Sequence, residues 1–317
     1  MAAFTLAGRA RLRHDRSMST LLAVGLGYCG RALLARDGLP FSRVIGTSRT
    51  REGAQALAAL SRPGVAVTGL PFDGVHLSAH LEQALRTANV LLLSAPPDAA
   101  GDPVLTVGRA ALMANLHLRS VIYLTTLGVY GDHKGAWVDE RTKPKPGSLR
   151  LERRLAAEAE WLRFGGARDV PVAILRLAGI YGPGRNALVQ VARGEARRID
   201  KPDQVFNRIH VDDISASIRA AVKRRFHGVV NVTDDLPTAP GEPILAAATL
   251  LGVEPPPAIP FDEAAQDMTP MALSFWAANK RVDNGRLKHE LGVTLTYPTY
   301  RQGLAALYAA GEGRDLK

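Results

Sequence analysis

A glycine-rich turn near the N-terminus has the residue types and spacing that bind phosphate. An apolar run at 21–24 leads into Gly25, Gly27 and Gly30, which form a Gly-x-Gly-x-x-Gly pattern ahead of a helical stretch. Gly25 permits a tight turn, Gly27 lets a pyrophosphate approach the backbone, and Gly30 lets the helix pack close to the strand. The helix N-terminus adds free N–H groups and a positive dipole end. The pattern predicts dinucleotide binding, with a purely structural glycine turn as the alternative.

The end of the next expected strand, at 43–46, indicates which dinucleotide the turn would hold. NAD-preferring sites usually carry an acidic residue about 20 positions past the glycines, whereas Ser48 and Arg49 stand here. Both could bind a 2′-phosphate through charge-assisted hydrogen bonds, which favours NADP over NAD. The alternative for Arg49 is that its side chain points to solvent. Asp73, just past the third expected strand, could contact the adenine edge, and the alternative is an ordinary turn residue. The residues expected to bind the cofactor are Gly25, Leu26, Gly27, Tyr28, Cys29, Gly30, Ser48, Arg49, Asp73, Ser94, Ala95 and Pro96.

Short apolar runs and amphipathic stretches alternate along the first 180 residues. Strands are expected at 21–24, 43–46, 65–68, 90–94, 120–125 and 172–177. The helices between and after them include 30–37, 103–118 and 149–164. Apolar runs bounded by helices are typical of buried parallel strands. The fold predicted from these βαβ units is α/β, a Rossmann-type doubly wound parallel sheet with a smaller C-terminal substrate lobe.

The same pattern divides the chain into three parts. Residues 1–17 are basic and lack a secretory h-region, so we expect a disordered tail or a misannotated start at which Met18 is the true first residue. An organelle transit segment is the alternative. Residues 18–180 are expected to form an NAD(P)-binding Rossmann domain. Residues 181–317, rich in Gly and Pro, are expected to form a mixed substrate lobe, with part of 205–235 returning to the sheet.

The formal charge of +10 suits anionic partners such as phosphorylated cofactors or nucleotide-linked substrates. The basic residues are nevertheless scattered in pairs such as Lys280 and Arg281, and only 6% of residues are aromatic. This pattern predicts solvated basic faces, a small-molecule substrate and no nucleic-acid partner.

One cysteine, Cys29, excludes an intrachain disulfide framework and a Cys-based zinc site, and it is expected to pack as a small buried residue. No close His or Cys spacing predicts a metal. No apolar run approaches the roughly 18 residues of a membrane helix. A cytoplasmic protein is therefore expected, and its oligomeric state stays open.

Four further segments keep a fixed order along the chain. They are Thr-Thr-Leu-Gly-Val-Tyr-Gly at 125–131, a segment closing in Tyr-Gly-Pro-Gly-Arg at 176–185, Arg-Ile-His-Val-Asp-Asp-Ile at 208–214, and 280–291. Together they resemble the extended, epimerase/dehydratase-like branch of the short-chain dehydrogenase/reductase superfamily, whose last helix the fourth segment is similar to. The resemblance implies that Thr126 stands at the catalytic Ser/Thr position and that the substrate-binding residues are Tyr181, Arg185 and Arg208. Ala178 replaces the usual Asn, and the glycine spacing differs from that branch, which indicates an atypical subgroup.

The expected catalytic helix departs from the family pattern. Its flanks match the family, and they place Arg150 at the position of the catalytic Tyr and Arg154 at that of the Lys. An arginine stays protonated near pH 7, so it can bind an anion or stabilise an oxyanion but cannot exchange a proton. The Tyr130-to-Lys134 spacing lies in a loop and is taken as a coincidence. Tyr130 and Tyr181 remain candidate proton donors, with packing as the alternative.

His210 and Asp212 could act together as a base, but the pattern favours a structural role. In that role Asp212 or Asp213 caps the following helix.

Two functions stay open at this point. The first is an NAD(P)-dependent oxidoreductase or epimerase/dehydratase-like enzyme acting on a small polar substrate. It rests on the glycine turn and on Thr126. The second is a catalytically silent NAD(P)-binding regulator or redox sensor of the same fold. It rests on Arg150 and Arg154.

Overall fold

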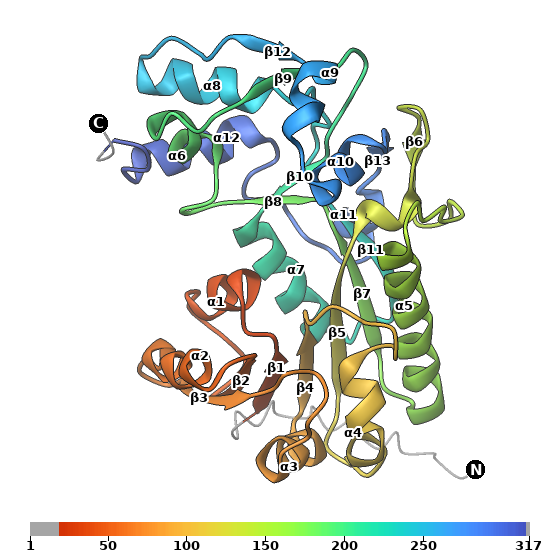
Figure 1. Ribbon diagram of the computed structural model, residues 1–317. Coiled ribbons are helices and arrows are strands. Elements are labelled where there is room, and N and C mark those ends of the chain that lie inside the picture. The colour runs from red at the N-terminus through yellow and green to blue at the C-terminus, as the bar shows by residue number, and fades with distance from the viewer. Residues whose placement is uncertain (1–18, 315–317) are drawn as a thin grey trace, which may run out of the picture.

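A seven-stranded parallel sheet forms the centre of the molecule (Figure 1). The computed structural model describes residues 19–314, so the tail expected at 1–17 lies outside the described residues. The strands are β1 (Thr20–Val24), β2 (Arg43–Ser48), β3 (Ala66–Pro71), β4 (Val90–Leu93), β5 (Ser120–Thr126), β7 (Val172–Leu177) and β11 (Gly228–Val232). Their order is β11-β7-β5-β4-β1-β2-β3, and every neighbouring pair is parallel. The strand order reverses between β1 and β4, which is where a Rossmann-type sheet opens its crevice.

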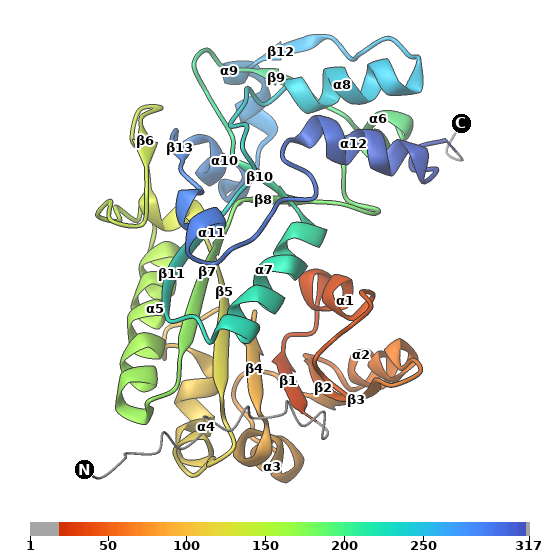
Figure 2. The same cartoon turned by 180° about the vertical axis from the view of Figure 1, so that it is seen from behind.

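Helices cover both faces of the sheet (Figures 1 and 2). One face carries α3 (Ala79–Thr87), α4 (Pro103–Met113) and α5 (Leu149–Arg168), and the other carries α1 (Tyr28–Leu34), α7 (Val211–Arg224) and α11 (Gly285–His289). Along β1, Leu21 and Ala23 join the core on the α1 side, while Leu22 and Val24 join the core on the α3 side. Such a strand must be apolar at every position, which explains the continuous apolar runs in the sequence. The short helices α2 (Arg51–Ala56) and η1 (Leu57–Leu60) lie beside β3.

A smaller lobe lies beyond the carboxyl edge of the sheet, at the top of Figure 1. Its core joins α6 (Ala187–Ala192), α8 (Glu242–Leu251) and α12 (Tyr300–Ala309) through side chains such as Leu188, Ala247 and Leu304. Its other elements are β8 (Gly179–Tyr181), β9 (Arg198–Asp200), β10 (Arg208–His210), β12 (Ala258–Pro260), α9 (Phe261–Ala264), η3 (Ala265–Asp267) and α10 (Pro270–Trp276). Three separate stretches of chain therefore build the lobe: one between β7 and α7, one between β11 and α11, and one after α11.

A short strand pair ties the lobe to the end of β5. After β5 come η2 (Leu127–Tyr130) and β6 (Trp137–Val138), and β6 pairs with β13 (Arg281–Val282). This pairing brings residues 279–282 beside the loop at 131–136, which is distant from them in the sequence.

Two local expectations are wrong. The helix expected at 30–37 begins at Tyr28, directly after the turn, and ends at Leu34. The segment 280–291 is not the last helix: it holds β13 and the short α11, and α12 follows. None of the helices formed by residues 19–314 has the length and apolarity to cross a membrane.

Candidate active site

The glycine turn sits at the carboxyl end of β1, beside β4. Gly25 has a φ of +85°, which only glycine adopts readily, and its N–H donates to Thr47 Oγ1 at 2.9 Å. Ser94 Oγ donates to the Gly25 carbonyl at 2.5 Å. A Cβ at Gly25 would lie 2.7 Å from that Oγ, so the position must be glycine. Thr47 and Ser94 thus fix the turn from the strands on either side; sequence reasoning missed Thr47, whose role follows only from the pairing of β2 with β1.

The backbone at Gly27 is unobstructed by side chains. A Cβ built on this exposed residue would meet nothing nearer than the Gly25 carbonyl oxygen, 3.9 Å away, so the backbone is open to a ligand. By contrast, a Cβ at Gly30 would lie 2.6 Å from Leu26 Cδ1, which shows how closely α1 packs on the strands. Within residues 19–314, α1 begins without a side-chain cap and without an acidic residue in its first turn. Nothing there repels an anion at the helix start.

The remaining cofactor candidates lie at the same edge of the sheet, with different surroundings. Ser48 ends β2 half-buried and Arg49 is exposed just after it. Asp73 Oδ1 accepts the N–H groups of Val75 and His76, both at 2.8 Å, and the hydrogen bonds from His76 hold the pKa of this carboxyl well below its usual range. Asp73 therefore closes a turn in this structure.

Cys29 lies half-buried against the core on the α1 side. Burial raises the pKa of its thiol to about 11, which does not favour a reactive thiolate.

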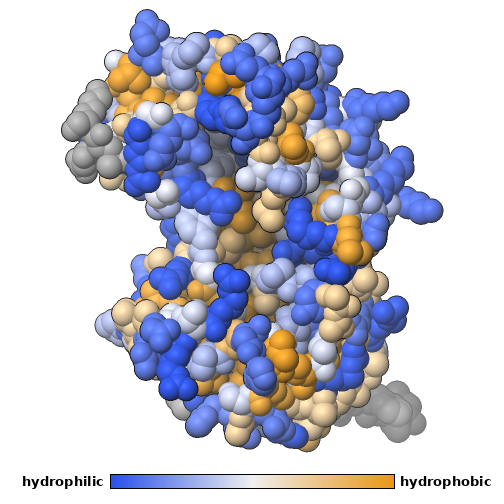
Figure 3. Space-filling view, in the orientation of Figure 1, coloured by the Kyte–Doolittle hydropathy of each residue, from blue (hydrophilic) through white to orange (hydrophobic). Residues whose placement is uncertain are grey.

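A cleft of about 910 Å³ opens between the sheet and the lobe. Figure 3 shows it as a hollow in the middle of the molecule, with apolar side chains inside. Of the expected site residues, Thr126, Arg150, Tyr181, Arg185 and Arg208 line it.

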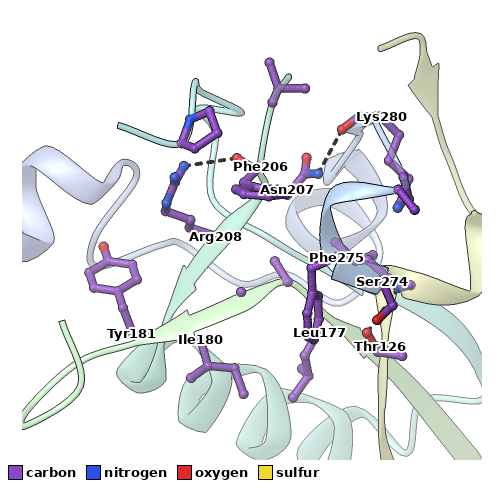
Figure 4. Close-up of a pocket in the computed structure, with 18 of the residues that line it drawn as sticks. Thr126, Leu177, Ile180, Tyr181, Phe206, Asn207, Arg208, Ser274, Phe275 and Lys280 are labelled. Carbon is purple, nitrogen blue, oxygen red and sulfur yellow. Dashed lines mark hydrogen bonds between the residues drawn. The ribbon is translucent and has the colours of Figure 1, made fainter. Parts of the chain in front are cut away.

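Thr126, the expected catalytic residue, is the last residue of β5 and directly precedes η2. Its Oγ1 accepts the N–H of Gly128 at 3.1 Å and so caps η2. The side chain is half-buried and lines the cleft, as does Ser274 of α10 (Figure 4). The hydroxyl proton stays available to an oxygen in the cleft, because the Gly128 contact uses a lone pair.

Tyr130, a candidate proton donor, does not line the cleft. Its side chain is fully buried, and its hydroxyl donates to Asn231 Oδ1 at 2.8 Å. The Arg176 guanidinium lies 4.8 Å from the centre of its ring. Burial raises the pKa of Tyr130, so the hydroxyl holds its proton. The cause is the turn of η2, which directs the side chain into the core under the site.

The two arginines at the family's Tyr and Lys positions are separated by the structure. Arg150, half-buried near the start of α5, lines the cleft, with its guanidinium carbon 6.0 Å from the centre of the Phe275 ring. Arg154 does not line the cleft; it lies one turn further along α5, close to Tyr123 inside the sheet. The two arginines of α5 therefore do not face the cleft together.

The lobe side of the cleft carries Tyr181, Arg185 and Arg208. The Tyr181 hydroxyl donates weakly to the Thr299 carbonyl at 3.5 Å, and burial raises its pKa, so it is a poor proton donor. Arg185 is exposed and lies 5.9 Å from the Tyr28 ring centre. Arg208 Nη1 donates to the Phe206 carbonyl at 3.1 Å (Figure 4).

The carboxyl group near Arg208 does not neutralise it fully. Burial raises the pKa of Asp234 to about 7, so this group is only partly ionised at neutral pH.

A buried polar network supports the site from below and was not anticipated. Arg176 Nη2 and Nε bind Glu158 Oε2 at 2.7 and 3.1 Å, and Thr125 Oγ1 donates to Glu158 Oε1 at 2.9 Å. The Arg176 and Glu158 side chains are 6% and 2% exposed. A pair buried this deeply must be fully hydrogen-bonded to be tolerated. The network fixes β5, β7 and α5 relative to one another directly beside Thr126.

Lys280 was expected on a solvated face and is instead 7% exposed. Its Nζ donates to the Gly131 carbonyl at 3.1 Å, and the residue lines the cleft (Figure 4). Burial lowers its pKa from 10.5 to about 8. No sequence signal identifies it, because its burial depends on the pairing of β13 with β6.

His210 and Asp212 take a structural role. His210, and neither Asp212 nor Asp213, is the N-cap of α7: its Nδ1 accepts the Asp212 N–H at 3.1 Å. Burial lowers the pKa of His210 to about 4, so the ring is neutral at pH 7. Asp213 instead accepts the N–H groups of Thr296 and Tyr297.

No cluster of His, Cys, Asp or Glu in the described part of the chain could hold a metal ion.

Comparison with known proteins finds similar curated proteins and similar solved structures. No family model matches the chain. Among curated proteins it is 26% identical to Protein YeeZ of Escherichia coli over 289 residues, covering 89% of this chain and 97% of that protein. It is 28% identical to a 3-diazoavenalumate denitrifying reductase from Streptomyces sp over 167 residues, 51% of this chain. The chain covers 54% of that reductase.

Solved structures match over most of their length. A conserved protein of unknown function from Silicibacter pomeroyi is 44% identical, with a TM-score of 0.78 over 93% of this chain and 100% of that one. A candidate NAD-dependent epimerase/dehydratase from Methylobacillus flagellatus is 28% identical, with a TM-score of 0.65 over 93% and 99%.

Proposed function

Because the chain belongs to the extended, epimerase/dehydratase-like branch of the short-chain dehydrogenase/reductase family, we propose that it is an NAD(P)-dependent enzyme. Its reaction is an oxidoreduction, or an epimerase/dehydratase-like conversion, of a small polar substrate bound between the sheet and the lobe. A nicotinamide dinucleotide supplies hydride transfer when bound. The likenesses to a reductase and to a candidate NAD-dependent epimerase/dehydratase support this class of chemistry.

The open backbone at Gly27 is the observation that carries the proposal. Gly25 and Gly30 are glycines because neighbouring atoms crowd them, whereas Gly27 faces free space. A glycine with no packing reason at the start of a helix is what close approach of a pyrophosphate requires. Ser94, Ala95 and Pro96 follow β4 at the same crevice.

The chain's own residues then act on the substrate from the cleft. The Thr126 hydroxyl can donate to a substrate oxygen. The Arg150 guanidinium can stabilise negative charge on that oxygen or hold an anionic group, but it releases no proton near pH 7. The family's Tyr-Lys pair is replaced, so the proton that accompanies reduction comes from another group or from water.

Ser48 and Arg49 support NADP as the preferred cofactor. A guanidinium that binds a 2′-phosphate contributes about 1.5–3 kcal/mol, which is roughly ten- to a hundredfold in affinity. We expect tighter binding of NADPH than of NADH, and loss of that preference in Arg49→Ala. Equal affinities in the wild-type protein would remove this assignment.

Fluorescence titration with NADPH and NADH tests the cofactor site. Gly27→Ala should weaken binding at least tenfold and leave the urea unfolding midpoint unchanged, because its Cβ clashes with no protein atom. Gly166→Ala is the matched control: its Cβ meets nothing within 4 Å, but it lies on α5, so binding should stay at the wild-type level. Unchanged binding in Gly27→Ala would contradict the proposal.

A turnover screen separates the enzyme from a silent regulator. NADPH oxidation is followed against a broad panel of carbonyl substrates. Binding of NADPH without turnover of any substrate would contradict an enzymatic function and would favour the alternative, a cofactor-binding regulator or redox sensor.

A further inference from the structure

The lining of the cleft is strongly cationic. Five of its side chains are basic, and within the described residues its only carboxylate is Asp132. Asp132 is already engaged, since its Oδ1 accepts the N–H groups of Lys134 at 3.0 Å and Asn279 at 2.9 Å. The basic residues are Lys145, Arg150, Arg185, Arg208 and Lys280.

None of these five cations forms an ion pair with a carboxylate of residues 19–314 within 4.0 Å. Arginines elsewhere in the structure do, including exposed ones such as Arg141 and the buried Arg176. The cleft therefore holds five cations that have no carboxylate partner within ion-pair distance among the described residues.

Lys280 is the deepest of the five. The side chains of Lys145 and Arg185 are exposed and those of Arg150 and Arg208 are half-buried, whereas Lys280 is 7% exposed. The Gly131 carbonyl is the acceptor that its Nζ reaches, which leaves N–H capacity on the ammonium. A buried charge is costly unless it is paired and hydrogen-bonded.

We propose that Lys280 anchors an anionic group of the substrate, a carboxylate or a phosphate. An anion there would pair the buried ammonium and take up its free N–H groups. Arg150 and Lys145, which line the same cleft, would add to the attraction for an anion. A neutral substrate oxygen would satisfy a hydrogen bond but would leave the excess of positive charge. The inference rests on the proposed function only in calling the ligand a substrate.

The protonation of Lys280 provides a signature that other cations lack. Asp132 is the charged group that acts on Lys280 and raises its pKa, against the effect of burial. His133 acts on Asp132 in the same loop, and Lys145 and Arg150 line the same cleft. Since burial lowers the pKa of Lys280 to about 8, its charge is lost as the pH rises through that value, and anion affinity should fall with it. An arginine at this position would stay charged throughout.

Isothermal titration with malonate and with inorganic phosphate, without cofactor, tests the anchor at pH 7.0 and 9.5. We expect one or both probes to bind the wild-type protein at pH 7.0, and Lys280→Met to bind at least tenfold more weakly. Wild-type binding should weaken about tenfold at pH 9.5, whereas Lys280→Arg should bind equally at both pH values. The matched control is Lys143→Met, an exposed lysine outside the cleft, which should behave as wild type.

The two probes distinguish the source of the anion, because malonate tests a carboxylate and phosphate a phosphoryl group. Phosphate held at the glycine turn would be lost in Gly27→Ala and kept in Lys280→Met. No binding of either probe to the wild type, or equal affinity in Lys280→Met, would overturn the proposal. Failure of NADPH binding in the same samples would refute the proposed function and leave the anion site standing.

Discussion

Replacing Lys280 with Met should stabilise the protein at neutral pH, although it removes a hydrogen bond. The Nζ lies in a wall of the cleft with the Gly131 carbonyl as its acceptor, and burial lowers its pKa from 10.5 to about 8. A lysine whose pKa is lower in the folded state binds fewer protons there than in the unfolded chain. Wild-type stability therefore rises with pH between about 8 and 10.5, and the charged lysine is a cost below that range.

The size of this cost follows from the shift. A displacement from 10.5 to about 8 corresponds to about 3 kcal/mol at pH 7. Loss of the Gly131 hydrogen bond offsets about 1 kcal/mol of the gain. We expect Lys280→Met to raise the free energy of unfolding by about 2 kcal/mol at pH 7. At pH 10 the remaining cost of the lysine is about 1 kcal/mol, so the variant and the wild type should be nearly equal.

Urea unfolding followed by far-ultraviolet circular dichroism at pH 7, 8.5 and 10 measures both values. The slope of the free energy against urea should not change, so that midpoints report stability. Lys143→Met controls for the loss of a lysine in general and should match the wild type at every pH. If Lys280→Met is less stable than the wild type at pH 7, or differs from it by the same amount at all three pH values, the described burial of the ammonium is wrong.

Three further substitutions test the site and its support. Arg150→Ala should raise KM for an anionic substrate more than it lowers kcat in steady-state kinetics, since Arg150 provides a ground-state contact; unchanged values of both would place it outside the site. Tyr130→Phe should leave the pH profile of kcat unchanged. It should lower the free energy of unfolding by about 1–2 kcal/mol, because Asn231 Oδ1 loses its hydrogen-bond donor. Loss of the basic limb of the pH profile would instead identify Tyr130 as the proton donor. Arg176→Met should destabilise the fold by about 3–5 kcal/mol in urea, because Glu158 keeps a buried charge, and a much smaller effect would mean that water reaches the pair.

The sheet and the cofactor turn could be predicted from the sequence because their signals are local. Each strand of the sheet's centre is a short apolar run, and the glycine pattern follows the first run directly. Thr126 was proposed from the family resemblance of the segment at 125–131, and its catalytic role remains a prediction. The preference for NADP remains a prediction.

The errors concern side chains whose surroundings come from distant parts of the chain. Tyr130 is buried, and its hydroxyl donates a hydrogen bond to Asn231 Oδ1 on the distant edge strand β11. Lys280 stands in a basic pair that resembles a solvated surface, and only the pairing of β13 with β6 places it against Gly131. His210 caps α7 through a ring nitrogen. The sequence pointed to Asp212 or Asp213 instead, because Asp is a preferred N-cap residue.

The lobe is assembled from three stretches of chain, which has a consequence for biosynthesis. Its core brings residues 181–188 against 247–251 and 300–307. Residues 300–307 are synthesised after the other parts of the lobe core, so this core cannot close before α12 has left the ribosome. The strands that carry the glycine turn are all made earlier, by residue 126. During translation the cofactor half of the site can therefore form first, and the substrate half must wait for α12 to be released.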